Sequence, residues 1–341
     1  MNRADPPPPS PPCPPKRRRW LIGFLLVALA FSVAVNFYLY EEYRAYFSDG
    51  NEPIEQYYSG SETSTDKIAV IKVQGVIMPP NTDRILRRIR HAKEDPDVKA
   101  VLLSIDSPGG AVADSHEIYH RIKELRESKP VAVHMKSMAA SGGLYVAMGA
   151  GTEGKIFAEP TTWTGSIGVI IPRMQMIGLA DKMGLESKPI KTGPFKDALS
   201  PFRELTPDEQ AVWDNIIEQA FDRFIGVIAE NRPELDVSQV RELATGEVYT
   251  ADDALKNRLI DSIGYEEAAL DDLYARIDRK AEDVRVITYE SSATLVEILL
   301  GTAQAGTPDQ QWQFAMESTV PRPMYCCSWL AGLTSGRFGR D

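Results

Sequence analysis

Residues 98–147 read VKAVLLSIDSPGGAVADSHEIYHRIKELRESKPVAVHMKSMAASGGLYVA, and this stretch decides the fold class of the chain. VKAVLLSI (98–105) is a short, continuous apolar run, as expected for a strand buried on both faces. A helix is predicted over 111–127, and PVAVHMKS (130–137) is a second strand, followed by a helix near Ser141. Strands that alternate with helices build a mainly parallel sheet with helices packed on it. The stretch therefore predicts an α/β fold.

The same alternation continues on both sides of this stretch. KIAVIKVQGVI (67–77) alternates and is rich in β-branched residues, which predicts a strand, and 82–94 has the apolar spacing of a helix. Residues 206–230 predict a long amphipathic helix. Its start carries a capping box, with Thr206 as the N-cap and Glu209 three residues later.

The N-terminal part of the chain predicts a membrane anchor. Residues 1–19 are Pro-rich and end in the basic run KRRR, so we expect a cytoplasmic tail there. Residues 20–40 carry no charge and, at ~1.5 Å rise per residue, would span roughly 31 Å, about one bilayer core. This length favours an uncleaved transmembrane helix over a cleaved signal peptide, whose apolar region has only ~7–15 residues.

The anchor divides the chain into parts. A polar linker is expected over 41–66, the α/β domain over 67–288, and a tail of unassigned role over 289–341. Because the basic run precedes the anchor, the N-terminus is expected in the cytoplasm and everything after Tyr40 outside it. The domain would then lie on the periplasmic side of the inner membrane, held there by a single pass.

Composition and charge exclude some classes of function. The formal net charge is −10 at pH 7, which argues against a nucleic-acid partner, because phosphate contacts need clustered Lys and Arg. The three cysteines give no disulfide framework, since two are adjacent and the third lies across the anchor: Cys326, Cys327 and Cys13. His116 and His120 have a spacing that can bind a metal, but no acidic third ligand stands out. We expect neither a metal nor a cofactor.

Two glycine-lined turns are candidates for chemistry. SPGGAV (107–112) follows a buried strand and opens a helix, which suits an oxyanion or a phosphate, although a tight turn alone also explains it. In MAASGG, Ser141 stands among small residues and Gly142 adds a backbone N–H beside it, an arrangement that recurs in acyl transfer. From these residues alone, a helix N-cap is the more common role for Ser141.

A serine nucleophile also requires a base. All four histidines precede the serine, and none lies in a motif that would aim it there: His91, His116, His120 and His134. Lys196 stands in KTGPFKDALSPFRELT (191–206), a loop-like segment. A lysine can act as a base if burial lowers its pKa from ~10.4 to about 7–8, but a solvated surface charge is the commoner role of any single lysine.

Taken in order, these motifs resemble the signal peptide peptidase SppA (protease IV) family. The series is SPGG, MAASGG, TGSIGVI (164–170), GPFKDALSPFRELT (193–206) and a closing GEVYTADDALKNRLIDSIG (246–264), and it covers roughly residues 67–265. MAASGG and K-D-x-x-S-P-x-R-x-x-T are specific to the family, whereas SPGG is shared with Clp-type proteases and crotonases. The single copy of the series is similar to the short members of the family.

The resemblance implies a Clp/crotonase-like α/β fold and a Ser–Lys dyad. It implies that Ser141 is the nucleophile, Lys196 the general base and Ser166 the serine that orients the lysine, with Gly110 and Gly142 as oxyanion donors. Members of the family assemble into ring- or dome-shaped homo-oligomers. In the short members, the serine and the lysine of one site come from neighbouring subunits, so an isolated monomer of this chain is expected to be inactive.

Three positions depart from the family pattern without removing a site residue. Asp106 stands where Asn commonly precedes SPGG, which would alter the hydrogen bonds of the turn. Lys136 stands where Gly is usual and could compete as the base, and Ala251 replaces a usual Gly in the closing motif.

The expected function is that of a membrane-anchored serine endopeptidase acting on short hydrophobic peptides, such as signal peptides that remain in the membrane after cleavage. Two alternatives stay open. One is a crotonase-like enzyme acting on acyl-CoA thioesters, which shares the SPGG turn but would be cytoplasmic and needs no Ser–Lys pair. The other is a catalytically silent membrane scaffold that has kept the fold.

Overall fold

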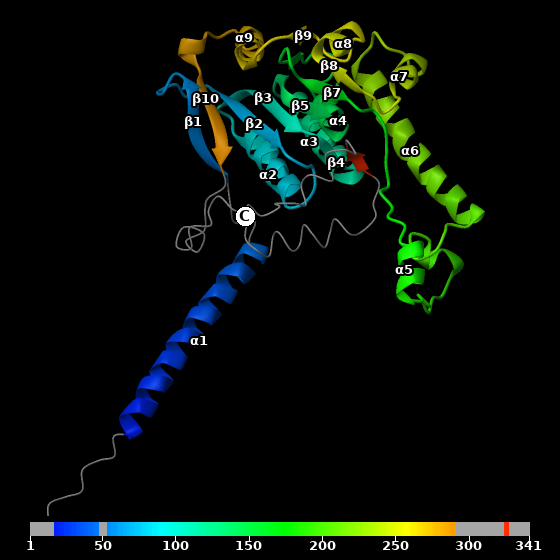
Figure 1. Ribbon diagram of the computed structural model, residues 1–341. Coiled ribbons are helices and arrows are strands. Elements are labelled where there is room, and N and C mark those ends of the chain that lie inside the picture. Colours follow the sequence, from blue (N-terminus) through cyan, green and yellow to red (C-terminus); the bar gives the residue numbers. More distant parts are fainter. Residues whose placement is uncertain (1–16, 48–52, 291–323, 327–341) are drawn as a thin grey trace, which may run out of the picture.

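A mostly parallel sheet forms the centre of the computed structural model, which describes residues 17–47, 53–290 and 324–326 (Figure 1). In spatial order its strands are β1 (Ile54–Gly60), β10 (Arg285–Glu290), β2 (Lys67–Gln74), β3 (Val98–Ser107), β5 (Val131–Ala140), β6 (Ile156–Ala158) and β9 (Ser262–Ile263). A short branch is formed by β7 (Trp163–Gly165), which pairs with β5 and with β8 (Val248–Thr250). The pairs β1–β10 and β7–β8 are antiparallel, and the other pairs of this sheet are parallel.

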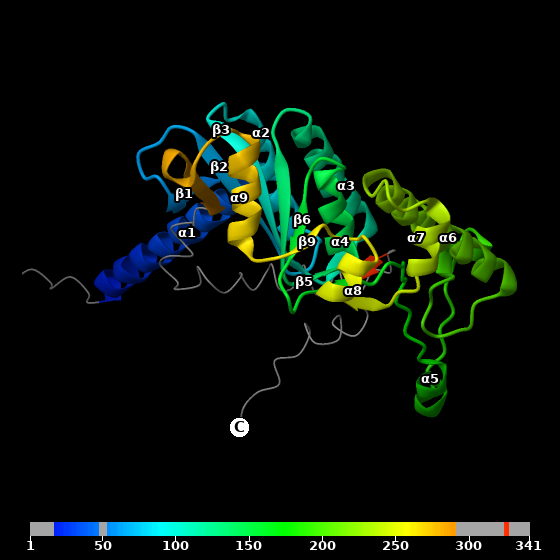
Figure 2. The same ribbon diagram turned by 90° about the horizontal axis from the view of Figure 1, so that it is seen from above.

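Helices cover both faces of the sheet (Figure 2). One face carries α9 (Glu266–Arg276), and the other carries α2 (Asn81–Glu94), α3 (Val112–Arg126) and α4 (Gly142–Ala147). The long helix α6 (Pro207–Asn231) packs on the same side as α4, and the remaining helices of the domain are α5 (Ile177–Met183), α7 (Val237–Leu243) and α8 (Ala251–Lys256).

Side chains of the central strands are buried on both faces. In β2, Ile68 and Val70 pack with α9, whereas Ala69 and Ile71 pack with the helices of the opposite face. Successive side chains of a strand point to opposite faces, so a strand covered on both sides needs apolar residues throughout. This burial explains the continuous apolar run in β3 and confirms the α/β fold predicted from it.

The helices and strands predicted around residues 98–147, and the long helix predicted after them, are present in the structure. The strand expected over 98–105 is β3, and the helix expected over 206–230 is α6. The capping box is present, because the Thr206 side chain accepts from the Glu209 N–H and the Glu209 carboxylate accepts from the Thr206 N–H.

The N-terminal helix α1 (Arg17–Phe47) covers the stretch predicted as an anchor. Apolar side chains along it, such as Phe24 and Phe31, are exposed. Within the part of the chain that the structure describes, no helix is both long and apolar enough to cross a membrane. The predictions for residues 1–16, including Cys13, lie outside the described residues.

Two segments expected outside the domain contribute strands. β1 lies inside the predicted linker 41–66, so the expectation of a linker is wrong for Ile54–Gly60. Backbone pairing with β10, rather than burial of side chains, holds β1 in the sheet, and most of its side chains are exposed. The sequence therefore shows no apolar periodicity there. β11 (Met324–Cys326) lies inside the predicted tail 289–341 and pairs with β4 (Gly109–Ala111). Cys327 lies outside the described residues.

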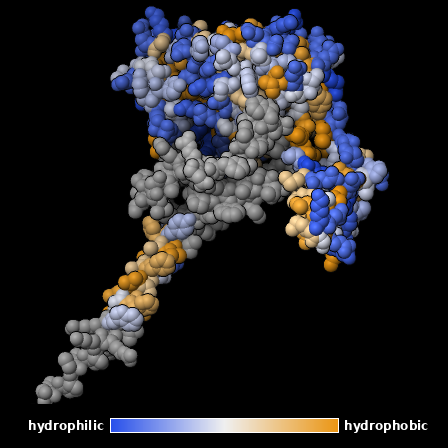
Figure 3. Space-filling view, viewed as in Figure 1, coloured by the Kyte–Doolittle hydropathy of each residue, from blue (hydrophilic) through white to orange (hydrophobic). Residues whose placement is uncertain are grey.

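Between β7 and α6 the chain leaves the sheet as an arm, residues 170–204, which projects from the domain and carries α5 (Figure 1). Several of its large apolar side chains are exposed: Met174 is 71% exposed, Met183 63% and Ile190 105%. Figure 3 shows apolar and polar residues mixed over the surface of this projection. A single chain therefore gives the arm little core of its own. Lys196 lies on the arm, in the 3₁₀ turn η2 (Pro194–Asp197).

Candidate active site

Ser141 occupies the junction between β5 and α4. Its backbone has φ 54° and ψ −113°, a conformation that is strained for a residue with a side chain. The side chain is buried, and its hydroxyl has no hydrogen-bond partner among the described residues. Ser141 stands at the N-cap position of α4 but makes no side-chain cap bond. The hydroxyl is thus free of the capping role that the local sequence favoured.

The backbones of two glycine turns meet beside this serine. A Cβ built on Gly142 would lie 3.1 Å from the backbone N of Gly110, and one built on Gly109 would lie 2.7 Å from the backbone N of Gly142. A Cβ on Gly110 would lie 2.0 Å from the carbonyl oxygen of Ile77. Only glycine permits such close approach of backbone to backbone. The structure therefore brings the two expected oxyanion donors together next to the candidate nucleophile.

Strand β7 holds a second serine beside the first. The Ser141 N–H donates to the Gly165 carbonyl at 2.8 Å, and the next residue, Ser166, also has a left-handed backbone with φ 51°. The Ser166 N–H donates to the Glu247 carbonyl at 2.6 Å, and its side chain is buried. Ser141 and Ser166 are therefore neighbours, because parallel pairing of β7 with β5 aligns the ends of the two strands.

Lys196 is not part of this cluster. It lies exposed on the arm, and it makes no side-chain hydrogen bond or ion pair with another residue that the structure describes. Since the Ser141 hydroxyl also lacks a partner in the described chain, the two dyad candidates are not in contact within one copy. A single chain thus assembles the serine, its neighbour Ser166 and the glycine turns, but not the base.

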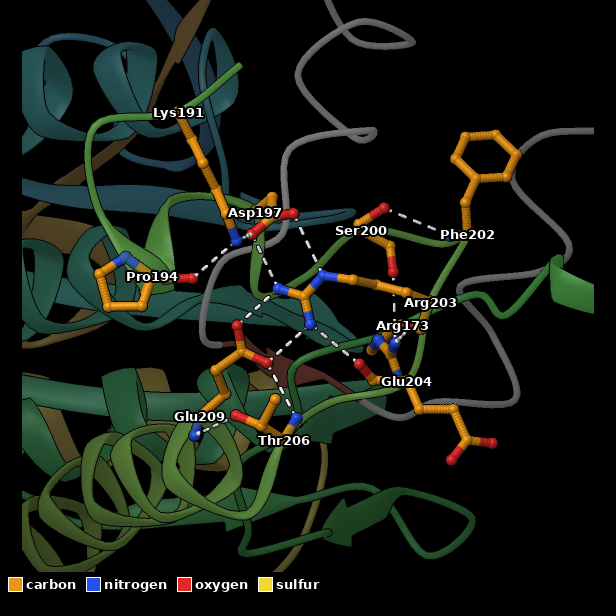
Figure 4. A network of polar contacts seen from close by, with 10 residues as sticks. All are labelled: Arg173, Lys191, Pro194, Asp197, Ser200, Phe202, Arg203, Glu204, Thr206 and Glu209. Atoms are coloured by element: carbon orange, nitrogen blue, oxygen red, sulfur yellow. Dashed lines mark hydrogen bonds and ion pairs between the residues drawn. The ribbon is translucent and has the colours of Figure 1, made fainter. Parts of the chain in front are cut away.

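An ion-pair network fixes the loop that carries Lys196 (Figure 4). Arg203 donates to the carboxylates of both Asp197 and Glu209, and Lys191 donates to Asp197 at 2.5 Å. The hydrogen bonds from Arg203 lower the pKa of the Asp197 carboxyl, and they lower that of Glu209 to about 2. The sequence alone indicates no role for Asp197 and Arg203, although their opposite charges, six residues apart, were the available signal.

The described C-terminal segment lies against the SPGG turn. β11 pairs antiparallel with β4, placing Tyr325 opposite Gly110. The Tyr325 ring is fully buried, stacked on Tyr145 with centroids 4.9 Å apart and packed against Phe224 at 4.6 Å, and its hydroxyl donates to the Ala220 carbonyl at 2.7 Å. An extended segment therefore adds as a strand at this turn with an aromatic side chain in an apolar pocket. Sequence reasoning missed it, because three residues carry no periodicity.

Asp106 has a local structural role at this end of the sheet. The register between β3 and β5 shifts next to it, so part of the regular ladder of hydrogen bonds is missing there. The Asp106 carboxylate accepts from the Ser137 hydroxyl at 2.5 Å and from the Met138 N–H at 3.2 Å. The side chain thus bridges the strand before the SPGG turn and the strand before Ser141.

Lys136 and the buried histidine do not contact the candidate nucleophile. His134 lies between two carboxylates, 3.3 Å from Glu159 and 3.7 Å from Glu266. The nearby imidazole of His134, and to a lesser extent the charge of Lys136, lower the pKa of the Glu266 carboxyl. In the part of the chain that the structure describes, no group of three or more His, Cys, Asp or Glu residues could hold a metal ion.

Comparisons with known proteins place these features in a family. A family model described as peptidase family S49 matches residues 123–280, and a model described as Clp protease matches residues 62–183. The two matches together span the SPGG turn, Ser141, Ser166 and the arm.

Individual relatives agree with the family models. A protein of Enterococcus faecium, provisionally named signal peptide peptidase SppA, is 35% identical over 271 residues, which cover 76% of this chain and 76% of that protein. A Synechocystis protein provisionally named as a protease is 38% identical over 241 residues, covering 70% of this chain and 85% of that protein. Protease 4 of Haemophilus influenzae is 32% identical over 258 residues, covering 72% of this chain but only 41% of its own length.

Proposed function

The chain belongs to peptidase family S49 and is a serine protease of that family, and from this premise we propose that it is a membrane-anchored endopeptidase that cleaves short hydrophobic peptides. Ser141 is the nucleophile, and Lys196 of a neighbouring copy is the general base. Ser166 orients that lysine, and the N–H groups of Gly110 and Gly142 hold the oxyanion. The match to a peptidase model decides against the acyl-CoA alternative.

The conformation of Ser141 is the observation that carries this proposal. A buried serine with a left-handed backbone and an unpartnered hydroxyl is costly to the fold, and strain of this kind persists mainly at functional sites. A purely structural serine at a helix start would instead cap the helix.

The exposed arm supports a base supplied by a second copy. Met183 and Ile190 are apolar and exposed on the same projection that carries Lys196. Contact with another copy would bury these side chains and move the lysine from solvent into a closed site. A lysine in such a site can lose its proton near neutral pH. The active unit is therefore a homo-oligomer, in keeping with the absence of a Ser141–Lys196 contact within one chain.

The reaction runs through an ester on the serine. Neutral Lys196 takes the hydroxyl proton of Ser141 while the oxygen attacks the peptide carbonyl, and Gly110 and Gly142 stabilise the developing oxyanion. The lysine then gives its proton to the leaving amine as the C–N bond breaks. Water, deprotonated by the same lysine, attacks the ester, and Ser141 regains its proton as the peptide acid leaves.

Strand pairing at β4 supports an extended, apolar substrate. β11 pairs antiparallel with this edge, and the Tyr325 ring beside it packs on the rings of Tyr145 and Phe224. An extended substrate that displaced β11 would gain backbone pairing without sequence preference, and apolar side chains would suit the same aromatic surface. Signal-peptide remnants combine both properties, so we take them as the substrate class.

The anchor is the remaining part of the proposal. Residues 20–40 are uncharged, they lie within α1, and their described apolar side chains make no core with the domain. The basic residues before them favour a cytoplasmic N-terminus and a catalytic domain on the periplasmic side. Carbonate extraction of membranes tests the anchoring, and protease protection of a tag fused after Asp341 tests the orientation.

Two variants of the full-length chain test the dyad. Ser141→Ala and Lys196→Ala should each lose at least about 10³-fold in kcat/KM on short apolar peptides, because a dyad fails when either member is removed. Substantial activity in both variants would refute the assignment. A serine-reactive phosphonate probe separates an enzyme from a silent scaffold: it should label the native chain and not Ser141→Ala.

A further inference from the structure

An acidic residue follows the candidate base directly, and the mechanism above does not use it. Asp197 stands next to Lys196 in the 3₁₀ turn η2. A carboxylate close to a lysine holds the lysine in its charged form, whereas a general base has to be neutral. The sequence therefore places a charge that opposes catalysis one residue away from the group that must lose its proton.

The Asp197 carboxylate points away from Lys196, and both of its oxygens accept hydrogen bonds from other side chains. Neighbouring side chains of a 3₁₀ turn point about 120° apart, since the turn has ~3 residues. Asp197 Oδ1 accepts from Lys191 Nζ at 2.5 Å and from Arg203 Nη2 at 2.8 Å, and Oδ2 accepts from Arg203 Nε at 3.1 Å. The Asp197 side chain is only 14% exposed, whereas Lys196 lies in solvent.

Every N–H of the Arg203 guanidinium is engaged in this arrangement. Besides Asp197, it bonds both carboxylate oxygens of Glu209, at 2.5 Å and 2.8 Å, and the Glu204 carbonyl at 2.9 Å. Glu209 is also the third residue of the capping box that starts α6, and its side chain is only 3% exposed. The planar fork of an arginine fits two carboxylates at once, which a lysine cannot do. The turn that carries Lys196 is thereby fastened to the end of a long helix.

The charges of this group cancel. Lys191 and Arg203 are cationic, and Asp197 and Glu209 are anionic, so the cluster is formally neutral. At its rim, Arg173 donates to the backbone carbonyls of Ser200 and Arg203, and Glu204 accepts from Gln175. Among the described residues, no carboxylate forms an ion pair with Lys196.

We propose that Lys191, Asp197, Arg203 and Glu209 form a clamp that positions the general base and keeps the neighbouring carboxylate from pairing with it. The proposal rests on the role of Lys196 proposed above. Arg203 and Asp197 are positioning residues that act through the lysine. Loss of Arg203 would release Asp197 toward Lys196, and the lysine would then require a higher pH to become neutral.

The pH dependence of kcat/KM on an apolar peptide tests the clamp, because its acid limb reports the base of the free enzyme. In the full-length chain, Arg203→Ala should move this limb to higher pH by about one unit, the size expected for a new opposite charge nearby. Adding Asp197→Asn to that variant should return the limb to its native position. Lys191→Met, which removes only one partner of Asp197, should move the limb in the same direction by less.

Arg173→Ala is the matched control. It removes bonds to backbone carbonyls of the same arm but leaves every partner of Asp197 in place, so activity can fall while the limb stays where it is. Light scattering on each variant, at the concentration of the assay, confirms that the oligomer is intact and that the comparison is between equal assemblies.

The outcomes are separable. If Arg203→Ala lowers the rate equally at every pH, or if Asp197→Asn does not restore the limb, the clamp is merely structural and the inference is wrong. If Arg203→Ala does not fold, Lys191→Met decides, and an unmoved limb in that variant overturns the clamp. If Lys196→Ala retains activity, the proposed base itself fails, a result that does not depend on any clamp variant.

Discussion

Ser141 and Lys196 are positioned by opposite means. Ser141 stands buried at the end of a central strand, fixed by backbone hydrogen bonds and close glycine contacts. Lys196 stands on an arm with exposed apolar side chains, and ion pairs rather than a core hold its loop. Folding of one chain completes the surroundings of the serine, whereas in the function proposed above the lysine reaches a site only when a second copy covers the arm. The difference teaches that folding and activation are separate events in the proposed enzyme.

The largest expected effect tests whether the serine and the lysine of one site come from two different copies. Ser141→Ala and Lys196→Ala chains, each inactive alone, should recover activity when co-expressed with different tags and purified through both. In a closed ring, each site joins the serine of one copy to the lysine of the next copy. If the two variants assemble at random in equal amounts, about a quarter of the sites would combine an intact serine with an intact lysine. Activity that stays at the level of the single variants would place both residues of a site in one copy.

A smaller but still large effect probes the serine side alone. Gly110→Ala forces a Cβ to within 2.0 Å of the Ile77 carbonyl oxygen, so the SPGG turn must move away from Ser141. We expect a loss of ~10²–10³ in kcat, as for removal of one oxyanion donor. Gly226→Ala on α6 is the control, because a Cβ there meets nothing within 4 Å, and it should leave kcat unchanged.

The proposed contact between the arm and a second copy can be disrupted without changing Lys196 itself. Ile190→Asp places a charge at a fully exposed position of the arm, and the cost of burying that charge between copies should dissociate the oligomer and lower activity by at least about tenfold. Sedimentation velocity measures the assembly, and the melting temperature of the domain should stay the same. Leu255→Asp, also exposed but on α8, serves as the control. An intact oligomer in the arm variant would contradict the proposed interface.

The smallest effect concerns acid stability of the clamp. The folded pKa of Glu209 is about 2, below its ordinary value of 4.5, so its charge stabilises the fold above pH 4.5 and this contribution is lost as pH falls toward 2. Glu209→Gln should therefore show a shallower fall in melting temperature between these two pH values than the native chain. Parallel slopes in the two proteins would argue that Glu209 is unpaired in solution.

Sequence reasoning recovered the elements that carry strong periodicity. The apolar run of β3 and the capping box at Thr206 were sufficient, because burial and capping leave local signatures. β1 and β11 left none, since backbone pairing with distant strands holds them and their side-chain patterns are short or exposed. Long-range pairing of this kind cannot be read from three to seven residues.

For the site, the local residues favoured a cap for Ser141 and a surface charge for Lys196. The first is corrected by a backbone geometry that no residue type encodes, namely a positive φ at a residue other than glycine. The second describes a single copy accurately, because Lys196 is exposed there. The family resemblance supplied the dyad, but it assigned no role to Asp197 or Arg203, whose partners emerge only from the fold.

The hydrogen bond from the Ser141 N–H to the Gly165 carbonyl ties the candidate nucleophile to the strand from which the arm departs. Only residues 166–169 separate this bond from the arm. Before a displacement of the arm could reach Ser141, it would have to move the buried side chain of Ile167 and break the backbone hydrogen bonds that Ser166 and Ile167 make with Glu247 and Gly246. In the proposed closed ring, each copy receives a lysine from one neighbour and gives its own lysine to the other. One absent copy would therefore leave two incomplete neighbours: one whose serine has no lysine, and one whose arm is uncovered.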